Sequence, residues 1–250
     1  MKLKLLFIVC CGAFVFFITG CGKQQETLNL PSLETYYPLQ TGRVFIYRLD
    51  SFVIPFSGSD LLMKSYHARD SIADTIRDNL GRLSYRVYRS LRDTLDVQAW
   101  QNIASYYITP TQNTIEVMDE HNLRFIKLAA PLRNDYSWMG NTYIDTRSAA
   151  SPYQYMDGWN YVYENVGLTY TVLQGTFAHT ATVLQQDETS PPGDFDPNNY
   201  QQRNYSVEVY AEGIGLVYKE FLHRTWQVTP PPAKFDNDSY GITLNLISYR

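Results

Sequence analysis

The sequence has 250 residues, a formal net charge of −4 and 15% aromatic residues, with 21 Tyr and 12 Phe among them. This length suits one large β domain or two small ones. No cluster of Lys and Arg offsets the acidic balance, which argues against nucleic acid as a partner because phosphates would be repelled.

The first twenty residues have the pattern of an export signal. Lys2 and Lys4 precede an apolar run from Leu5 to Ile18. As a helix this run would be about 21 Å long, short of the roughly 30 Å hydrocarbon core of a bilayer. The pattern therefore favours a signal peptide over residues 1–20. A short membrane helix, or an ordinary signal peptide followed by a chance cysteine, is the alternative interpretation.

The apolar run ends in Ile18-Thr19-Gly20-Cys21, which resembles the lipobox of bacterial lipoproteins. In that family the chain is cleaved before the cysteine, a diacylglycerol is attached to its sulfur, and its freed amine is acylated. Ile18 and Thr19 replace the more usual leucine and alanine or serine. The resemblance implies that Cys21 is lipidated and holds the protein on a membrane, since two lipid signals make attachment stable.

Removal of residues 1–20 would also remove Lys2, Lys4, Cys10 and Cys11, which leaves a charge of −6 and a single cysteine, Cys21. The remaining chain would then have no disulfide and no cysteine metal site. Residues 21–35 are mostly polar and contain Pro31, so we expect a flexible tether there. A single β-rich domain is expected over residues 36–250.

Alternating apolar and polar residues, with turn residues about every ten positions, predict an all-β domain. Strands are expected at residues 44–53, 83–90, 103–109, 113–119, 123–129, 161–163, 168–173, 176–184, 205–212, 216–228 and 241–247. Residues 63–76 fit either a helix or a strand, and a hairpin with the next strand is favoured. Residues 187–204 are expected to form a polar loop, and Ser151-Pro152 to begin a short helix.

These elements predict a mainly β fold with one or two short helices. We expect a single antiparallel, strongly curved sheet that forms an incomplete barrel. A sandwich of two packed sheets is the alternative.

Several segments resemble uncharacterised cell-envelope lipoproteins of the Bacteroidota type. They are Tyr37-Pro38-Leu39 with Gly42, Glu120 to Leu128, Trp138 to Asn141, and Val209 to Glu220. The resemblance implies a lipid-anchored envelope protein, with the outer membrane as the expected location and either of its faces possible. It implies no activity. The resemblance also suggests O-glycosylation in Asp-Ser/Thr-aliphatic triplets, which would place it at Ser71, Thr75 or Thr94.

Few residues point to catalysis, and we assign no catalytic residue, metal ligand or cofactor. The four histidines are His67, His121, His179 and His223, and no two have the spacing of a ligand pair. Glu208, Glu212 and Glu220 are interpreted as solvated strand charges. Asp194, Asp196 and Asn198 are spaced as in a calcium loop, but the glycine and glutamate of that motif are missing.

An aromatic stripe is the main candidate for binding. Its members are Tyr153, Tyr155, Trp159, Tyr161 and Tyr163. They could line a groove for a sugar, peptide or lipid chain, or pack as ordinary sheet residues.

The sequence favours a non-catalytic protein that binds a small hydrophobic or glycan ligand, or an envelope protein partner. A structural or assembly component of a surface complex is the first alternative. A glycan or peptide hydrolase is the second.

Overall fold

The computed structural model describes residues 31–54 and 61–250. The expected signal peptide, Cys21 and most of the expected tether lie outside these residues. Within the two described ranges, no helix combines the length and the apolar character that crossing a bilayer requires.

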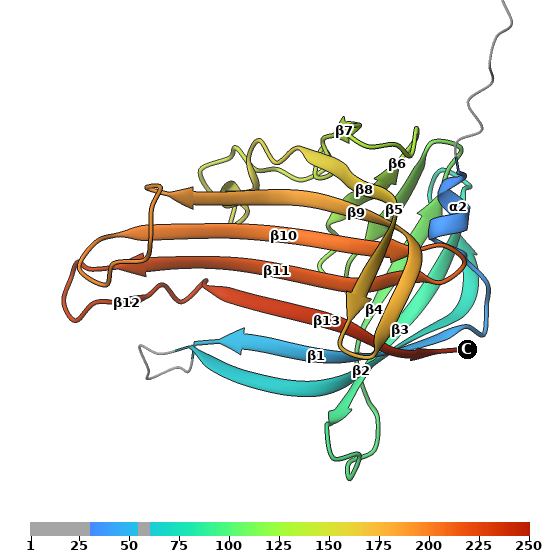
Figure 1. Cartoon of the computed structure of the whole chain (residues 1–250), viewed down its shortest axis with the longest axis horizontal. Coiled ribbons are helices and arrows are strands. Elements are labelled where there is room, and N and C mark those ends of the chain that lie inside the picture. Colours follow the sequence, from blue (N-terminus) through green and yellow to red (C-terminus); the bar gives the residue numbers. More distant parts are fainter. Residues whose placement is uncertain (1–30, 55–60) are drawn as a thin grey trace, which may run out of the picture.

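The described residues form one antiparallel sheet of thirteen strands, which curves into a nearly closed barrel (Figure 1). The order in the sheet is β6-β5-β4-β3-β2-β1-β13-β11-β10-β9-β8-β7, and β12 pairs with β11. The bounds are β1 Val44–Val53, β2 Leu62–Arg77, β3 Leu83–Asp93, β4 Gln101–Pro110, β5 Thr114–Met118, β6 Arg124–Ala129, β7 Ser137–Trp138, β8 Tyr161–Val172, β9 Gly175–Ser190, β10 Gln201–Ala211, β11 Gly215–Gln227, β12 Lys234–Phe235 and β13 Tyr240–Tyr249. The predicted incomplete barrel is confirmed. The alternative sandwich is wrong, because one continuous ladder of pairings joins β6 to β7.

Period-two alternation explains which side chains fill the barrel. On β1, Phe45, Tyr47 and Leu49 are buried, while the residues between them are half-buried. The ambiguous segment 63–76 is part of the strand β2, and its residues Ala68, Asp70 and Ile72, at alternate positions, are buried. The period-two alternation therefore predicts the secondary structure of this segment correctly, as a strand. The i, i+4 spacing of its apolar residues does not indicate a helix.

Two other local predictions are corrected. The expected loop 187–204 is shorter, because β9 continues to Ser190 and β10 already begins at Gln201. The two strands pair along this extension, with Gln202 opposite Ser190, so their polar residues form a longer wall instead of a loop. The helix expected after Ser151 is a single 3-10 turn, Gln154–Met156, preceded by a bond from the Tyr153 N–H to Ser151 Oγ.

The barrel closes where its two end strands, β6 and β7, approach each other. The Ile126 N–H donates to the Gly140 carbonyl at 2.7 Å, and Trp138 Nε1–H donates to the Ile126 carbonyl at 2.8 Å. The Tyr163 hydroxyl both accepts from the Ala129 N–H and donates to the Ala129 carbonyl, each at 2.9 Å. These bonds replace part of the missing ladder, so that edge groups of β6 are satisfied.

A one-turn helix, α2 (Leu33–Tyr36), closes one end of the barrel (Figure 1). Ser32 is its N-cap, and its side chain accepts a hydrogen bond from the Glu34 N–H. Leu33 and Tyr36 are buried, and the Gly213 N–H in the β10–β11 turn donates to the Thr35 carbonyl at 2.8 Å. The helix lies across the expected boundary between tether and domain at residue 35.

The β8–β9 hairpin bends sharply and folds over the outer face of the barrel (Figure 1). Asn165, Gly167 and His179 have positive φ angles of 53°, 83° and 52°, and the β8–β9 register shifts in the same region. Beyond the bend, Tyr170 packs against Tyr218 of β11 with ring centroids 5.6 Å apart. This second layer explains why Val207 and Val209 of β10 are buried although they point out of the barrel.

Candidate binding cavity

The barrel encloses a cavity of about 280 Å³ that is lined by residues from most of its strands. β11 begins beside α2, next to the turn whose Gly213 N–H bonds the Thr35 carbonyl. Further along β11, His223 pairs with Tyr240, the first residue of β13. Tyr240 therefore lies toward the end of the barrel opposite α2. Tyr240 lines the cavity together with the exposed residues Glu120 and His121 of the β5–β6 turn. The cavity therefore opens at the end opposite α2.

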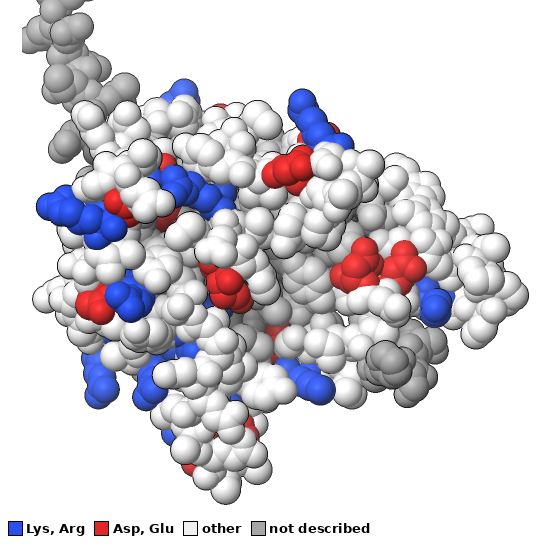
Figure 2. All heavy atoms as spheres, turned by 180° about the vertical axis from the view of Figure 1, so that it is seen from behind, with Lys and Arg blue, Asp and Glu red and all other residues white. Residues whose placement is uncertain are grey.

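Seen from behind, the surface is hollowed near its centre, and basic and acidic side chains are interspersed around the hollow (Figure 2). No single sign of charge dominates this face. Two buried carboxylates, Glu208 and Asp70, lie inside the barrel.

The deep part of the cavity contains a buried carboxylate, Glu208, which is only 2% exposed. Lys127 Nζ donates to Glu208 Oε1 at 2.8 Å, Lys219 Nζ is 3.3 Å from the same oxygen, and the Tyr210 hydroxyl donates to Oε2 at 2.7 Å. Burial opposes ionisation, but the two ammonium groups and the hydroxyl outweigh it and lower the pKa of Glu208 to about 2. Glu208 is therefore a fixed anion, which makes it unsuitable as a general acid near neutral pH.

Sheet register brings two of these residues together, and barrel closure brings the third. Glu208 on β10 lies opposite Lys219 on β11 in the ladder. Lys127 belongs to β6, at one end of the sheet, and reaches Glu208 because curvature brings that end across the barrel. Burial, and after it the neighbouring ammonium of Lys127, lower the pKa of Lys219.

A second ion pair lies on the wall formed by β2, β3 and β4. Asp70 and Arg89 are register partners, and Arg89 Nε donates to Asp70 Oδ1 at 2.7 Å while Nη2 bonds the other oxygen. The Tyr106 hydroxyl also donates to Asp70 Oδ2, at 3.0 Å. Burial disfavours the charge on Arg89, but Asp70 outweighs burial and raises the guanidinium pKa.

Gln185 presents an unpaired donor to the cavity. It is 3% exposed, and its Oε1 accepts a 2.7 Å hydrogen bond from Ser206 Oγ, which orients the amide. Its Nε2 has no hydrogen-bond partner among the described residues. A buried donor without a partner is costly, so an acceptor placed here would be favoured.

The rest of the cavity wall is apolar and aromatic. Trp159 packs beside Phe221 with ring centroids 6.1 Å apart, and Met156, Ile242 and Leu244 complete this part of the lining. The cavity thus has a charged deep part and an apolar remainder, which is the arrangement expected of a site for an amphipathic molecule.

The predicted aromatic stripe is divided between the cavity and the wall. Tyr153, Trp159 and Tyr161 line the cavity. Tyr155 instead stacks on His223, with centroids 3.8 Å apart, and Tyr163 seals the contact between β8 and β6. The 3-10 turn at Gln154–Met156 breaks the period-two pattern on which the stripe was predicted.

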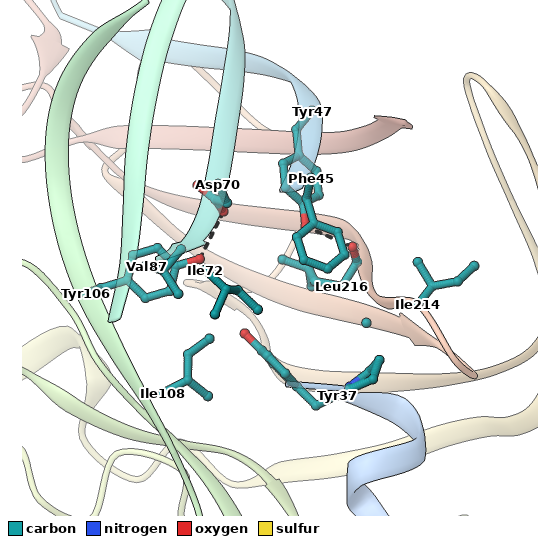
Figure 3. Close-up of a pocket in the computed structure, with 12 residues that line it drawn as sticks. Tyr37, Phe45, Tyr47, Asp70, Ile72, Val87, Tyr106, Ile108, Ile214 and Leu216 are labelled. Atoms are coloured by element: carbon teal, nitrogen blue, oxygen red, sulfur yellow. Dashed lines mark hydrogen bonds between the residues drawn. The ribbon is translucent and has the colours of Figure 1, made fainter. Parts of the chain in front are cut away.

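A second, smaller pocket of about 30 Å³ lies near α2 and shares Tyr37, Tyr106 and Leu216 with the main cavity. Figure 3 shows Tyr37 pointing from the segment after α2 toward Ile72 and Ile108. Tyr47 Oη donates to the Leu216 carbonyl at 3.1 Å on the facing side. This volume holds about one water molecule, so the larger cavity is the candidate site.

The histidines do not form a site. His67 bonds Asp96 at 2.7 Å, His121 lies at the cavity opening, His179 is at the hairpin bend, and His223 is buried beside Asn204. Burial lowers the pKa of His223. Residues 31–54 and 61–250 contain no group of three His, Cys, Asp or Glu side chains that could share a metal ion.

The acidic candidates are also separated. Glu208 is the buried anion described above and not the solvated charge that the sequence predicts, whereas Glu212 is exposed in the β10–β11 turn. Glu220 accepts a hydrogen bond from the Tyr218 hydroxyl at 2.7 Å, and Asp196 caps a loop by accepting from the Asn198 N–H at 2.9 Å.

Sequence reasoning missed the residues that give the cavity its character: Lys127, Lys219, Arg89, Asp70 and Gln185. One signal was present for three of them, because Lys127, Lys219 and Arg89 are charged side chains inside predicted strands. Asp70 lies in the segment 63–76, for which a strand was only favoured, and Gln185 directly follows the strand predicted at residues 176–184. Among the glycosylation candidates, Thr75 is exposed while Ser71 and Thr94 are half-buried, and modification there stays a prediction.

Comparisons of the chain with protein-family models, with curated proteins and with solved structures find no match. The function is therefore inferred from the geometry of the cavity.

Proposed function

We propose that the protein is a lipid-anchored envelope protein whose barrel binds a small amphipathic molecule without catalysing a reaction on it. The observation that carries this proposal is the cavity of about 280 Å³, charged at depth and apolar elsewhere. Such a volume is close to the lower end of ligand sites in proteins.

The state of the two interior carboxylates favours binding over hydrolysis. Glu208 and Asp70 are each held by cations and by a tyrosine hydroxyl. A glycosidase needs one carboxyl group that can donate a proton and a second that is free to attack or to activate water. Both carboxylates here are occupied by structural partners.

The membrane attachment in this proposal comes from the lipobox resemblance at Cys21. A lipid on Cys21 would hold the barrel at a membrane of the cell envelope, with the outer membrane proposed. The tether and the barrel would then act as a membrane-bound receptor or carrier for the ligand.

The test uses the full exported chain with Cys21→Ala, which would be free of lipid. Organic extracts of the purified protein are analysed by mass spectrometry, and the stripped protein is titrated with 1-naphthylamine, a fluorescent probe that is neutral at pH 7 and small enough for the cavity. We expect a co-purifying molecule or saturable binding of one probe per chain.

A matched pair of variants locates the binding. Val117→Phe narrows the cavity, since Val117 lines it, whereas Val97→Phe adds the same ring at a site that is 81% exposed. Probe binding should fall in the first variant and persist in the second. A protein with no co-purifying molecule and no saturable probe binding would contradict the proposal and favour a structural role.

A further inference from the structure

We propose that the ligand is a monocarboxylate with a short apolar or aryl body, and that its carboxylate binds between Lys219, Lys127 and the free amide donor of Gln185. This inference rests on the proposed function, because it names the ligand class of the same cavity.

The interior has one positive charge in excess. Arg89, Lys127 and Lys219 are three cations, and Asp70 and Glu208 are two carboxylates, which leaves a net charge of +1. A buried charge without a counterion is costly. A ligand with one negative charge would balance the interior.

Two hydrogen-bond donors in the cavity, Lys219 and Gln185, also lack a full set of acceptors. An ammonium group has three hydrogens to donate, and the only ion pair of Lys219 among the described residues is with Glu208. Gln185 Nε2 is buried and has no partner there either. A carboxylate offers two oxygens and about four acceptor positions, so a single group could satisfy donors of both residues.

The opening selects against more strongly charged molecules. Asp119 and Glu120 line the cavity at the β5–β6 turn, so a second negative charge would meet repulsion on entry. A phosphate monoester carries about −1.5 to −2 at neutral pH, whereas a carboxylate carries one charge. The single excess positive charge of the interior and the acidic residues at the opening therefore both favour a monocarboxylate.

The apolar lining sets the size of the rest of the molecule. A cavity of about 280 Å³ has the volume of roughly nine water molecules, which corresponds to a ligand of about ten non-hydrogen atoms. Trp159, Phe221 and Leu244 provide the surface against which an alkyl chain or an aromatic ring would pack.

The experiment compares octanoate with octan-1-ol and octyl phosphate, which share one alkyl chain but differ in charge. Each is tested for displacement of 1-naphthylamine from the Cys21→Ala form of the full chain. We expect octanoate to bind at least tenfold more tightly than octan-1-ol, and octyl phosphate more weakly than octanoate.

Variants assign this preference to the cavity cations. Lys219→Met and Lys127→Met each leave Glu208 with one lysine and the Tyr210 hydroxyl, so both should fold and bind the neutral probe. Each should weaken octanoate binding about tenfold and leave octan-1-ol unchanged. Lys234→Met, at an exposed lysine of β12, is the control and should change neither.

The outcomes separate this inference from the proposed function. Equal affinities for octanoate and octan-1-ol, or an octanoate affinity unaffected in both lysine variants, would overturn the monocarboxylate while binding in the cavity stands. Tighter binding of octyl phosphate would also overturn it. Absence of binding by the neutral probe and by all three compounds would contradict the proposed function itself.

Discussion

The carboxylate of Glu208 and the ammonium of Lys127 are 2.8 Å apart, although the residues are 81 positions apart in the sequence and lie on strands that are not neighbours in the sheet. The contact joins β6, at one end of the sheet, to the long wall that contains β10. It therefore links the closure of the barrel to the charge balance of the cavity.

Glu208→Gln should destabilise the protein strongly. Removal of the carboxylate charge leaves Lys127 and Lys219 close together without their shared counterion, and loss of one partner of a buried ion pair costs about 3–5 kcal/mol. Urea unfolding at pH 7 measures the change. Glu212→Gln, at an exposed position of the next turn, should change stability by less than about 0.5 kcal/mol, and equal effects of the two substitutions would contradict the role of Glu208.

The same carboxylate should contribute to acid denaturation. Its pKa falls from an ordinary value of 4.5 to about 2 on folding, so the unfolded chain binds the proton more readily. Its stabilising contribution is thus complete above about pH 4.5 and is lost as the pH falls toward 2. Unfolding measured from pH 5 to pH 2 should show a smaller loss of stability in Glu208→Gln than in the unmodified protein, and parallel pH profiles would refute this.

Tyr163→Phe should weaken the closure of the barrel. The substitution leaves the N–H and the carbonyl of Ala129 without their partner, and unsatisfied buried groups cost about 1–3 kcal/mol. Hydrogen exchange at the Ala129 amide should become faster, with a lower urea midpoint. Tyr143→Phe, at a tyrosine that is 57% exposed, serves as the control, and unchanged exchange at Ala129 would count against the predicted role.

Gly140→Ala should be destabilising because no space exists for a side chain. A Cβ at residue 140 would overlap the ring of Tyr161, which is only 1% exposed and cannot move away. Overpacking of this kind costs about 1–3 kcal/mol, measurable as a lower unfolding temperature. Gly175→Ala meets no atom within 4 Å and lacks a positive φ, so an equal loss there would show that the Tyr161 contact is unimportant.

Cys21→Ala should release the protein from the membrane fraction. The lipobox resemblance predicts that this sulfur carries the diacylglycerol, and the substitution would remove that predicted anchor. Fatty-acid labelling and membrane fractionation of cells measure the effect, with Cys10→Ala as the control inside the expected signal peptide. Continued labelling and retention of Cys21→Ala would exclude lipidation at this residue.

The sequence was sufficient to predict the β class, the curved sheet and most strands, because alternation is a local signal that each strand carries on its own. β2 shows this clearly, since Ala68, Asp70 and Ile72 are buried with a period of two. The bend of the β8–β9 hairpin was not predictable. It depends on left-handed backbone at Asn165 and His179, and neither residue type requires that conformation.

The charged part of the cavity was not predictable, because it arises from sheet closure. Glu208 and Glu212 look alike in the sequence, as acidic residues four positions apart. One is buried between two lysines and the other is exposed. Only the register with β11 and the approach of β6 across the barrel distinguish them.

The helix α2 closes the end of the barrel at which the chain enters, and the cavity opens at the opposite end. If Cys21 carries the lipid, the ten residue-to-residue steps from Cys21 to Pro31 span at most about 36 Å, and they lead to the closed end. The opening would then face away from the bilayer. Exchange of the ligand would follow its free concentration in the surrounding water and not its partition into the membrane that holds the protein.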